Sequence, residues 1–278
     1  MSSILTNNSA MVALQNLKSI NMDLSKTQNE ISTGKSISSA SDNASMWAIS
    51  KVMEADVAGF SAISKSLALG ESTVAVAAAG ADKIVEILKE MKEKIVTATG
   101  ANVDHSKLST DVKALSDQIK SIIGAAQFNG MNLLSDTGAG SGTSLKVLAS
   151  LDRTSSAVTA TSITVKSAEF SNELATAATL SVASTADATT ALGTIETLIT
   201  AAIKGAAALG SSKGHIEDQQ KFVSKIIDSM TSGIGALVDA NMEEASARLQ
   251  ALQVQQQLGT QSLSIANKAP QMILQLFK

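Results

Sequence analysis

The sequence predicts a mainly α-helical protein, an elongated rod of nested coiled-coil helices formed by both chain ends, with a small β-hairpin-containing module in the middle. Apolar residues recur at gaps of three and four over long stretches at both ends of the 278-residue chain. The chain has a single proline, Pro270. Aromatic residues make up only 2% of it, so small side chains that suit close helix-on-helix contact must form most of the core.

Charge and composition exclude several classes of protein. The formal net charge of -3 comes from 22 basic and 25 acidic residues without long blocks, so we expect no nucleic-acid partner and no membrane partner. The longest apolar run, Val74 to Ala81, is far below the ~20 residues of a membrane helix. The absence of cysteine removes disulfides and thiolate metal sites. The first residues lack a basic patch followed by an apolar stretch, so we expect no cleaved secretory signal.

Each end of the chain is predicted to form an amphipathic helix with one thin apolar seam. From Asn8 to about Thr33 the seam consists of Ala10, Leu17, Leu24 and Ile31 at intervals of seven, with Ala13 and Ile20 between them. Near the C-terminus it consists of Met242, Ala245, Leu249, Leu252, Gln256, Gly259, Leu263 and Ala266. Such thin seams bury too little surface to hold a lone helix in water. We therefore expect the two helices to pair with each other and with other copies of the chain.

A polar connector, "ISTGKSISSASDNA", separates the first helix from the inner helices. Ser41, Asp42 or Asn43 is suited to cap the next helix, which is expected to continue to about Thr99. Its clearest apolar stripe consists of Ile84, Leu88, Met91, Ile95 and Ala98. A second inner helix is expected from about Asp104 to Gln127, with Val112, Leu115, Ile119, Ile122 and Ala126 on one face.

The middle of the chain changes character after a turn at "FNGMN". The segments "SLKVLAS" and "SITVKS" alternate like short strands, and the rest, including the glycine cluster from Gly138 to Gly142, indicates a small and weakly specified module. Helix is expected again from near Ala186, with a long seam at Ile195, Leu198, Ala202, Leu209, Ile216, Val223, Ile227, Met230, Ile234 and Leu237. The seam slips in phase between Leu237 and Met242, so we place a domain boundary there.

Catalytic motifs are absent from the sequence. The two histidines, His105 and His215, are interpreted as surface residues in helix-start or turn segments, so we predict no metal site. No serine lies in a nucleophile-elbow context, although a Ser-His-Asp arrangement stays open in a serine-rich chain. We expect no enzyme activity and no cofactor.

Several strings of the sequence resemble bacterial flagellins, especially the short flagellins of alphaproteobacteria: "ALQNL", "ISTGKSISSASDNASMWAIS", "FNGMNLL" and "ALQVQQQLGTQSLSIANKAPQMILQLFK". The resemblance implies a structural subunit that self-assembles into the flagellar filament used for swimming. It implies an inner-tube domain of residues 1–32 plus 240–278, an outer-tube domain of residues 33–135 plus 186–239, and a short variable surface module of residues 136–185. The self-assembly seam would then consist of Ala10, Leu17, Leu24, Ile31, Leu249, Leu252, Leu263 and Ala266.

The same resemblance implies a secreted protein of the extracellular filament. Its partners would be other flagellin copies, the flagellar export apparatus, an export chaperone, the filament cap and the hook-junction proteins. Two positions depart from the pattern of flagellins detected by the vertebrate flagellin receptor: Glu90 stands in place of arginine and Lys94 in place of leucine. Ser36 also replaces an arginine of many flagellins. The alternatives are a hook-filament junction protein and a secreted coiled-coil binding protein or effector.

Overall fold

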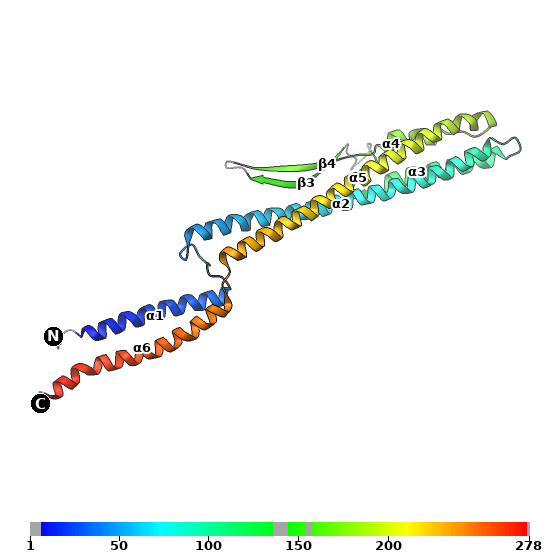
Figure 1. Cartoon of the computed structure of the whole chain (residues 1–278). Helices are drawn as coiled ribbons and strands as arrows, with labels where there is room; N and C mark the ends of the chain where they lie inside the picture. The colour runs from blue at the N-terminus through cyan, green and yellow to red at the C-terminus, as the bar shows by residue number, and fades with distance from the viewer. Residues whose placement is uncertain (1–6, 136–143, 154–156, 277–278) are drawn as a thin grey trace. The chain divides into compact units, whose positions relative to one another are not determined.

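The computed structural model describes residues 7–135, 144–153 and 157–276 (Figure 1). The glycine cluster from Gly138 to Gly142 lies outside these residues. The elements of the described chain are α1 (Asn8–Thr33), α2 (Ala44–Ala98), α3 (His105–Ala125), β1 (Gln127–Phe128), β2 (Met131–Asn132), β3 (Ser144–Arg153), β4 (Val158–Lys166), α4 (Phe170–Glu173), the short 3-10 helix η1 (Ala175–Thr179), α5 (Thr185–Val238) and α6 (Met242–Leu276). The predicted mainly α fold class is confirmed.

The chain divides into two compact units, which are described separately. One contains Met1–Val57 and Ser229–Lys278, and the other contains Ala58–Asp228. Both divisions fall within long helices, since α2 and α5 each contribute residues to both units. These units are defined by packing. The domain boundaries implied by the flagellin resemblance stay a prediction.

The helices begin and end where short polar residues and glycine allow it. The Asn7 side chain accepts a hydrogen bond from the Ala10 amide at 3.1 Å, and Asn43 Oδ1 accepts one from the Met46 amide at 3.2 Å. Gly34 ends α1 in the left-handed conformation, with a φ of 68°. The predicted phase slip near residue 240 is a real interruption, because α5 ends at Val238 and α6 begins at Met242.

The core of the second unit consists of apolar stripes on α2, α3 and α5. The α2 stripe from Ile84 to Ala98 and the α5 positions from Ile195 to Val223 are buried, as their spacing predicts. On α3, however, Leu115 and Ile122 are only half-buried, and Ser116 and Ile123 are buried instead. Val112, Ile119 and Ala126 are buried as predicted, and only the positions between them were wrong by one residue, because gaps of three and four fit either set.

Two hairpins follow α3 in this unit. Strands β1 and β2 pair Phe128 with Met131 across a turn in which Asn129 and Gly130 both have positive φ, as the Asn-Gly signal predicts. Strands β3 and β4 pair antiparallel from Ser144 opposite Lys166 onward, with a bulge at Ala149. The Gln219 side chain of α5 donates a hydrogen bond to the Ala149 carbonyl at 2.9 Å, which fastens the bulge to the helix.

The segment after β4 is better packed than the weakly specified module expected from its sequence. Phe170 of α4 is fully buried, and Leu174 and Ala177 are 4% and 2% exposed. Gly205 of α5 makes room for the Phe170 ring, because a Cβ at position 205 would overlap the ring atoms. This contact joins residues 35 positions apart, which local sequence patterns do not reveal.

Candidate assembly surface

Helices α1 and α6 form an antiparallel pair in the first unit. Hydrogen bonds join them at three levels. The Ala240 amide donates to the Gly34 carbonyl at 2.9 Å, Gln256 Nε2 donates to Asn21 Oδ1 at 2.7 Å, and Asn7 Nδ2 donates to the Ala266 carbonyl at 2.8 Å. The N-terminal end of α1 therefore lies beside the C-terminal half of α6, as the opposed seams of the sequence suggest.

The structure brings the predicted seam residues together between these two helices. The half-buried members are Ala10, Leu17, Leu24, Ile31, Leu249, Leu263 and Ala266, and the buried one is Leu252. Ala245 and Thr27 are also buried, at 6% and 2% exposure. A Cβ at Gly259 would lie 3.1 Å from Leu17 Cδ1, so the glycine permits a close approach of the helices. Met242 does not belong to the seam: it is 43% exposed because it begins α6, directly after the helix break.

Packing between α1 and α6 is incomplete. A pocket of about 270 Å³ interrupts it, lined by Ala13, Asn16, Ile20, Gln255, Leu258, Gly259 and Ser262. Seven of the eight seam side chains are only half-buried and keep contact with solvent, as expected for so thin an apolar stripe. The α1–α6 pair therefore keeps apolar surface that a further contact could bury.

A second apolar stripe lies on the outer faces of the same helices. On α1 it consists of Met11, Leu14 and Met22, which are 63%, 58% and 59% exposed. On α6 it consists of Val254, Leu258 and Ile265, which are 56%, 60% and 64% exposed. At 3.6 residues per turn, Val254 and Ile265 lie roughly opposite the α6 seam, whereas Leu258 also borders the pocket between the two helices. We call these six residues the outer stripe.

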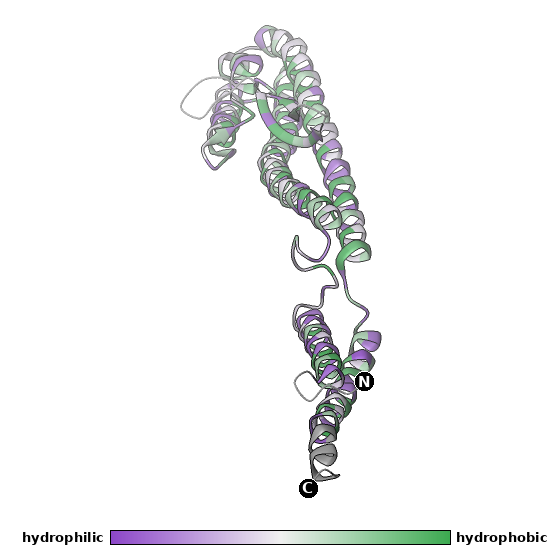
Figure 2. Ribbon diagram, turned by 90° about the vertical axis from the view of Figure 1, so that its left-hand side faces the viewer, coloured by the Kyte–Doolittle hydropathy of each residue, from purple (hydrophilic) through white to green (hydrophobic). Residues whose placement is uncertain are grey.

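Sequence reasoning missed the outer stripe. The seam was assigned from the longest regular heptad, and the remaining apolar residues were left without a role. Its signal was nevertheless present, because Val254, Leu258 and Ile265 follow one another at gaps of four and seven. Figure 2 shows hydrophobic and hydrophilic residues interspersed along both terminal helices.

The connector fixes the start of the terminal pair. The backbones of Lys35 and Asp239 form an isolated antiparallel β-bridge. The Ser36 amide and hydroxyl both donate hydrogen bonds to the Val238 carbonyl, at 2.7 and 3.2 Å. Lys35 also forms an ion pair of 3.4 Å with Glu54. A hydrogen bond from Lys51 lowers the pKa of Glu54, with a smaller contribution from Lys35. Ser36 thus has its own structural contact in the connector.

Asp42 organises the rest of the connector. One of its carboxylate oxygens accepts hydrogen bonds from the backbone amides of Ser38 and Ser39 at 3.1 and 2.9 Å, and from their hydroxyls at 3.2 and 3.0 Å. These bonds lower the pKa of Asp42, the backbone amide of Ser39 contributing most. Asp42 therefore stabilises the turn, and Asn43 caps the helix.

The residues considered for other chemistry lie apart from each other. His105 begins α3 and is half-buried, with Nδ1 3.1 Å from the Val182 carbonyl. His215 is exposed within α5, so its placement in a helix start or turn was wrong: the glycines around it do not interrupt the helix. Among the residues described by the structure, no group of three or more His, Cys, Asp or Glu could hold a metal ion.

By length and composition alone, α5 could cross a membrane. Its apolar residues have another explanation in this structure. Ile195, Leu209 and Ile216 are at most 1% exposed and belong to the core of the second unit. Burial in that core accounts for part of the apolar character of the helix, since 28% of its most apolar window is buried.

The two positions associated with the vertebrate receptor lie on α2. Glu90 is exposed. Lys94 is half-buried and forms an ion pair of 3.4 Å with Asp111 of α3. Lys92, two residues earlier on the same helix, forms an ion pair with Glu196 of α5. Charged pairs thus link α2 to both of its neighbouring helices in this region.

The fold and the outer stripe define a helical subunit with an unfinished terminal pair. Comparison with known proteins gives its family. The model of the bacterial flagellin N-terminal helical region matches residues 4–139, and that of the bacterial flagellin C-terminal helical region matches residues 192–277. The chain is 45% identical to a flagellin of Brucella melitensis, with 100% of both chains covered. It is 40% identical to the flagellin FljM of Caulobacter vibrioides, with 100% of this chain and 99% of that protein covered. The chain belongs to the bacterial flagellin family.

A solved structure is similar in fold. It is a putative flagellar hook-associated protein from Vibrio parahaemolyticus, with a TM-score of 0.53, 16% identity, and coverage of 71% of this chain and 100% of that one. At this identity the likeness concerns the fold alone. The predicted resemblance to flagellins is confirmed by the family matches and by the alphaproteobacterial relatives.

Proposed function

We propose that this flagellin polymerises through the outer stripe of α1 and α6, with the α1–α6 seam holding the two helices in register. Flagellins are structural proteins of the extracellular flagellar filament and not enzymes, and this chain is a subunit of that filament. The observation that supports the proposed surface is the exposure of six large apolar side chains on one helix pair, each more than half exposed. Large apolar side chains that stay exposed along one helix pair are candidates for contacts with a partner.

The seam and the outer stripe have different parts in this proposal. Ala10, Leu17, Leu24, Ile31, Leu249, Leu252, Leu263 and Ala266 act in assembly by pairing α1 with α6 within one subunit. Met11, Leu14, Met22, Val254, Leu258 and Ile265 supply the surface that other copies cover. A pair this thin is marginal by itself, so burial between copies would contribute much of its stability.

Further features of the proposal rest on the flagellin family. Residues 1–32 plus 240–278 would form the inner tube and residues 33–135 plus 186–239 the surrounding tube, with residues 136–185 at the surface. The chain would be exported without a cleaved signal peptide through the flagellar export apparatus, with an export chaperone. The filament cap and hook-junction proteins would be its other partners.

Replacing Leu258 with aspartate tests the proposed surface. Leu258 is 60% exposed, so most of the change falls on solvent-facing surface, and circular dichroism checks its effect on the α1–α6 pocket that Leu258 borders. In a polymer it would bury a charge without a partner, at a cost on the order of several kcal/mol for each subunit. The matched control is Gln253→Asp, which adds the same charge at an exposed polar position of the same helix.

Sedimentation and electron microscopy of seeded protein measure assembly, and circular dichroism checks the monomer. We expect filaments from the wild type and from Gln253→Asp, and none from Leu258→Asp. Normal filaments from Leu258→Asp would show that the outer stripe is not an assembly surface.

A further inference from the structure

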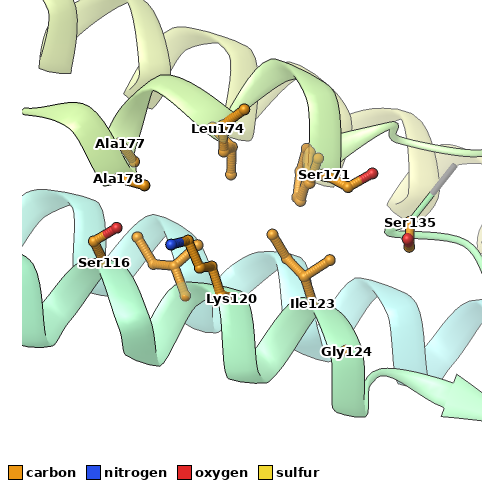
Figure 3. A pocket seen from close by; sticks show the side chains of 12 residues that line it. Ser116, Lys120, Ile123, Gly124, Ser135, Ser171, Leu174, Ala177 and Ala178 are labelled. Atoms are coloured by element: carbon orange, nitrogen blue, oxygen red, sulfur yellow. The ribbon is translucent and has the colours of Figure 1, made fainter. Parts of the chain in front are cut away.

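The second unit contains a pocket on the side of α3 that faces α4 and η1 (Figure 3). Its volume is about 490 Å³. Ile119, Ile123 and Leu174 give it an apolar lining, and the buried ring of Phe170 forms part of its wall. Alanines of η1 lie along its opposite edge, so small side chains keep it open.

Two observations indicate that this region is incompletely packed in a single chain. Ser116 lines the pocket at 2% exposure, and its Oγ is buried without a hydrogen-bond partner in the described part of the chain. Lys120, also in the lining, makes only a loose ion pair of 3.7 Å with Asp117, and both side chains are about 60% exposed. The pocket is thus an apolar cavity, and the exposed ion pair of Lys120 with Asp117 at its edge is free to rearrange.

A matching projection lies elsewhere in the same unit. Phe222 of α5 is 54% exposed, whereas Phe60 and Phe170 are buried. Asp218, one turn before Phe222, and Lys221, the residue directly before it, form an ion pair of 3.2 Å, with both side chains more than 70% exposed. Phe222 is therefore an apolar projection that also has an Asp-Lys pair beside it.

We propose that Phe222 of one flagellin copy inserts into the α3–α4 pocket of a neighbouring copy. Residues that carry most of the binding energy at protein interfaces typically include buried aromatic anchors that fill pockets of the partner. The two ion pairs could exchange members across the contact, Lys120 with Asp218 and Asp117 with Lys221, so that no charge is left unpaired. This inference rests on the assembly function.

The positions of the two surfaces make the contact heterologous. Gly205 of α5 lies against Phe170, so the pocket lies near residue 205 along the axis of α5. Phe222 is 17 residues further along the same helix. At 1.5 Å per residue the two levels differ by roughly 25 Å. Because the two surfaces differ, one end of every assembly keeps an unoccupied α3–α4 pocket and the other end keeps an uncovered Phe222. Such contacts extend into open helical polymers when they do not close into a ring.

Cross-linking tests the contact directly, because the chain has no cysteine of its own. Phe222→Cys and Ala178→Cys are prepared as separate proteins, mixed, assembled, and oxidised with copper phenanthroline. A disulfide between them can form only between copies. Gln118→Cys replaces Ala178→Cys in the control, since it is exposed on the side of α3 turned away from the pocket.

We expect a disulfide-linked dimer in filaments assembled from Phe222→Cys mixed with Ala178→Cys. Filaments from Phe222→Cys mixed with Gln118→Cys should contain only a trace of this dimer. Well-formed filaments with equal cross-linking in both mixtures would overturn the proposal while leaving the filament function intact. Phe222→Leu and Phe222→Asp in the cysteine-free chain give a second measurement. We expect near-normal assembly for leucine and at least a tenfold higher critical concentration for aspartate. Unchanged assembly of Phe222→Asp would also overturn it.

Discussion

Val147 of β3 lies directly against Gly70 of α2. A Cβ at position 70 would fall 2.5 Å from Val147 Cγ2 and 2.8 Å from Cγ1. The β3–β4 hairpin therefore approaches the helix backbone at this point, and Val147 is 2% exposed there. Gly59 repeats the arrangement 11 residues earlier, where a Cβ would lie 2.9 Å from Leu151 Cδ1. Two glycines about three helical turns apart thus form a smooth side of α2 for the hairpin.

Gly70→Ala should destabilise the second unit. Alanine raises helix propensity by up to ~1 kcal/mol, but overpacking typically costs about 1–3 kcal/mol. The cost of overpacking should exceed the gain in helix propensity, because the β-branched side chain of Val147 has few rotamers with which to move away. We expect a net loss of about 1–2 kcal/mol in the free energy of unfolding, measured by urea denaturation.

Gly210→Ala is the control for helix propensity. Gly210 lies within α5, and nothing lies within 4 Å of a Cβ built there. The same substitution should therefore stabilise the protein by about 0.5–1 kcal/mol. If both variants shift stability in the same direction, the hairpin does not press on α2.

Much of the helical fold could be predicted from sequence, and the reason is periodicity. The α5 seam is buried as predicted at Ile195, Leu209 and Ile216, because a regular heptad leaves one choice of face. Where two sets of residues fit equally well, as with Leu115 and Ser116 of α3, the pattern could not decide. The contact of Phe170 with Gly205 could not be predicted, because no pattern within either segment indicates a partner 35 residues away.

The candidate site was predicted only in part, for a related reason. The sequence identifies Leu252 and Leu263 as one face of α6 but does not say whether that face meets α1 or another copy. The structure assigns them to the α1–α6 pair, whereas Leu258 stays 60% exposed and only borders the pocket between the two helices. An exposed apolar residue becomes a candidate for assembly only when the inner face of its helix is known.

The connector should lose its order in acid. The pKa of Asp42 is lowered in the folded state, so its contribution to stability is fully present above the unfolded value near 3.8. It is lost as pH falls below that value and through the folded pKa. We expect an NMR titration of the Asp42 carboxyl with a midpoint below 3.8, together with changes in the Ser38 and Ser39 amide signals. Asp42→Asn should remove the amide changes; if they persist, another group causes them.

Glu90 and Lys94 are proposed to weaken activation of the vertebrate flagellin receptor. By the resemblance, Glu90 replaces a positive charge of detected flagellins by a negative one and Lys94 replaces an apolar contact by a charge, and either change should weaken binding to the receptor. Lys94 is also held by Asp111. We expect little response to the wild type in a cell reporter assay and a clear gain for the Glu90→Arg, Lys94→Leu double variant. A wild-type response equal to that of an enterobacterial flagellin would contradict the proposal.

Leu263→Asp tests the α1–α6 seam itself. Leu263 is half-buried between α1 and α6, one turn from Gly259, which contacts Leu17. A carboxylate there would be partly desolvated without a partner, a penalty on the order of several kcal/mol if burial becomes complete in the polymer. The terminal helices should lose helicity and filaments should not form.

The second unit has its own core in α2, α3 and α5, so its main thermal transition should stay within a few degrees of the wild type in the Leu263→Asp variant. Ser264→Asp, at the exposed neighbouring position, should assemble normally. Circular dichroism and seeded sedimentation of the three proteins separate the possibilities. Normal filaments from Leu263→Asp would mean that pairing of α1 with α6 is not needed for assembly. A large drop in its main melting transition would mean instead that the two units depend on each other for stability.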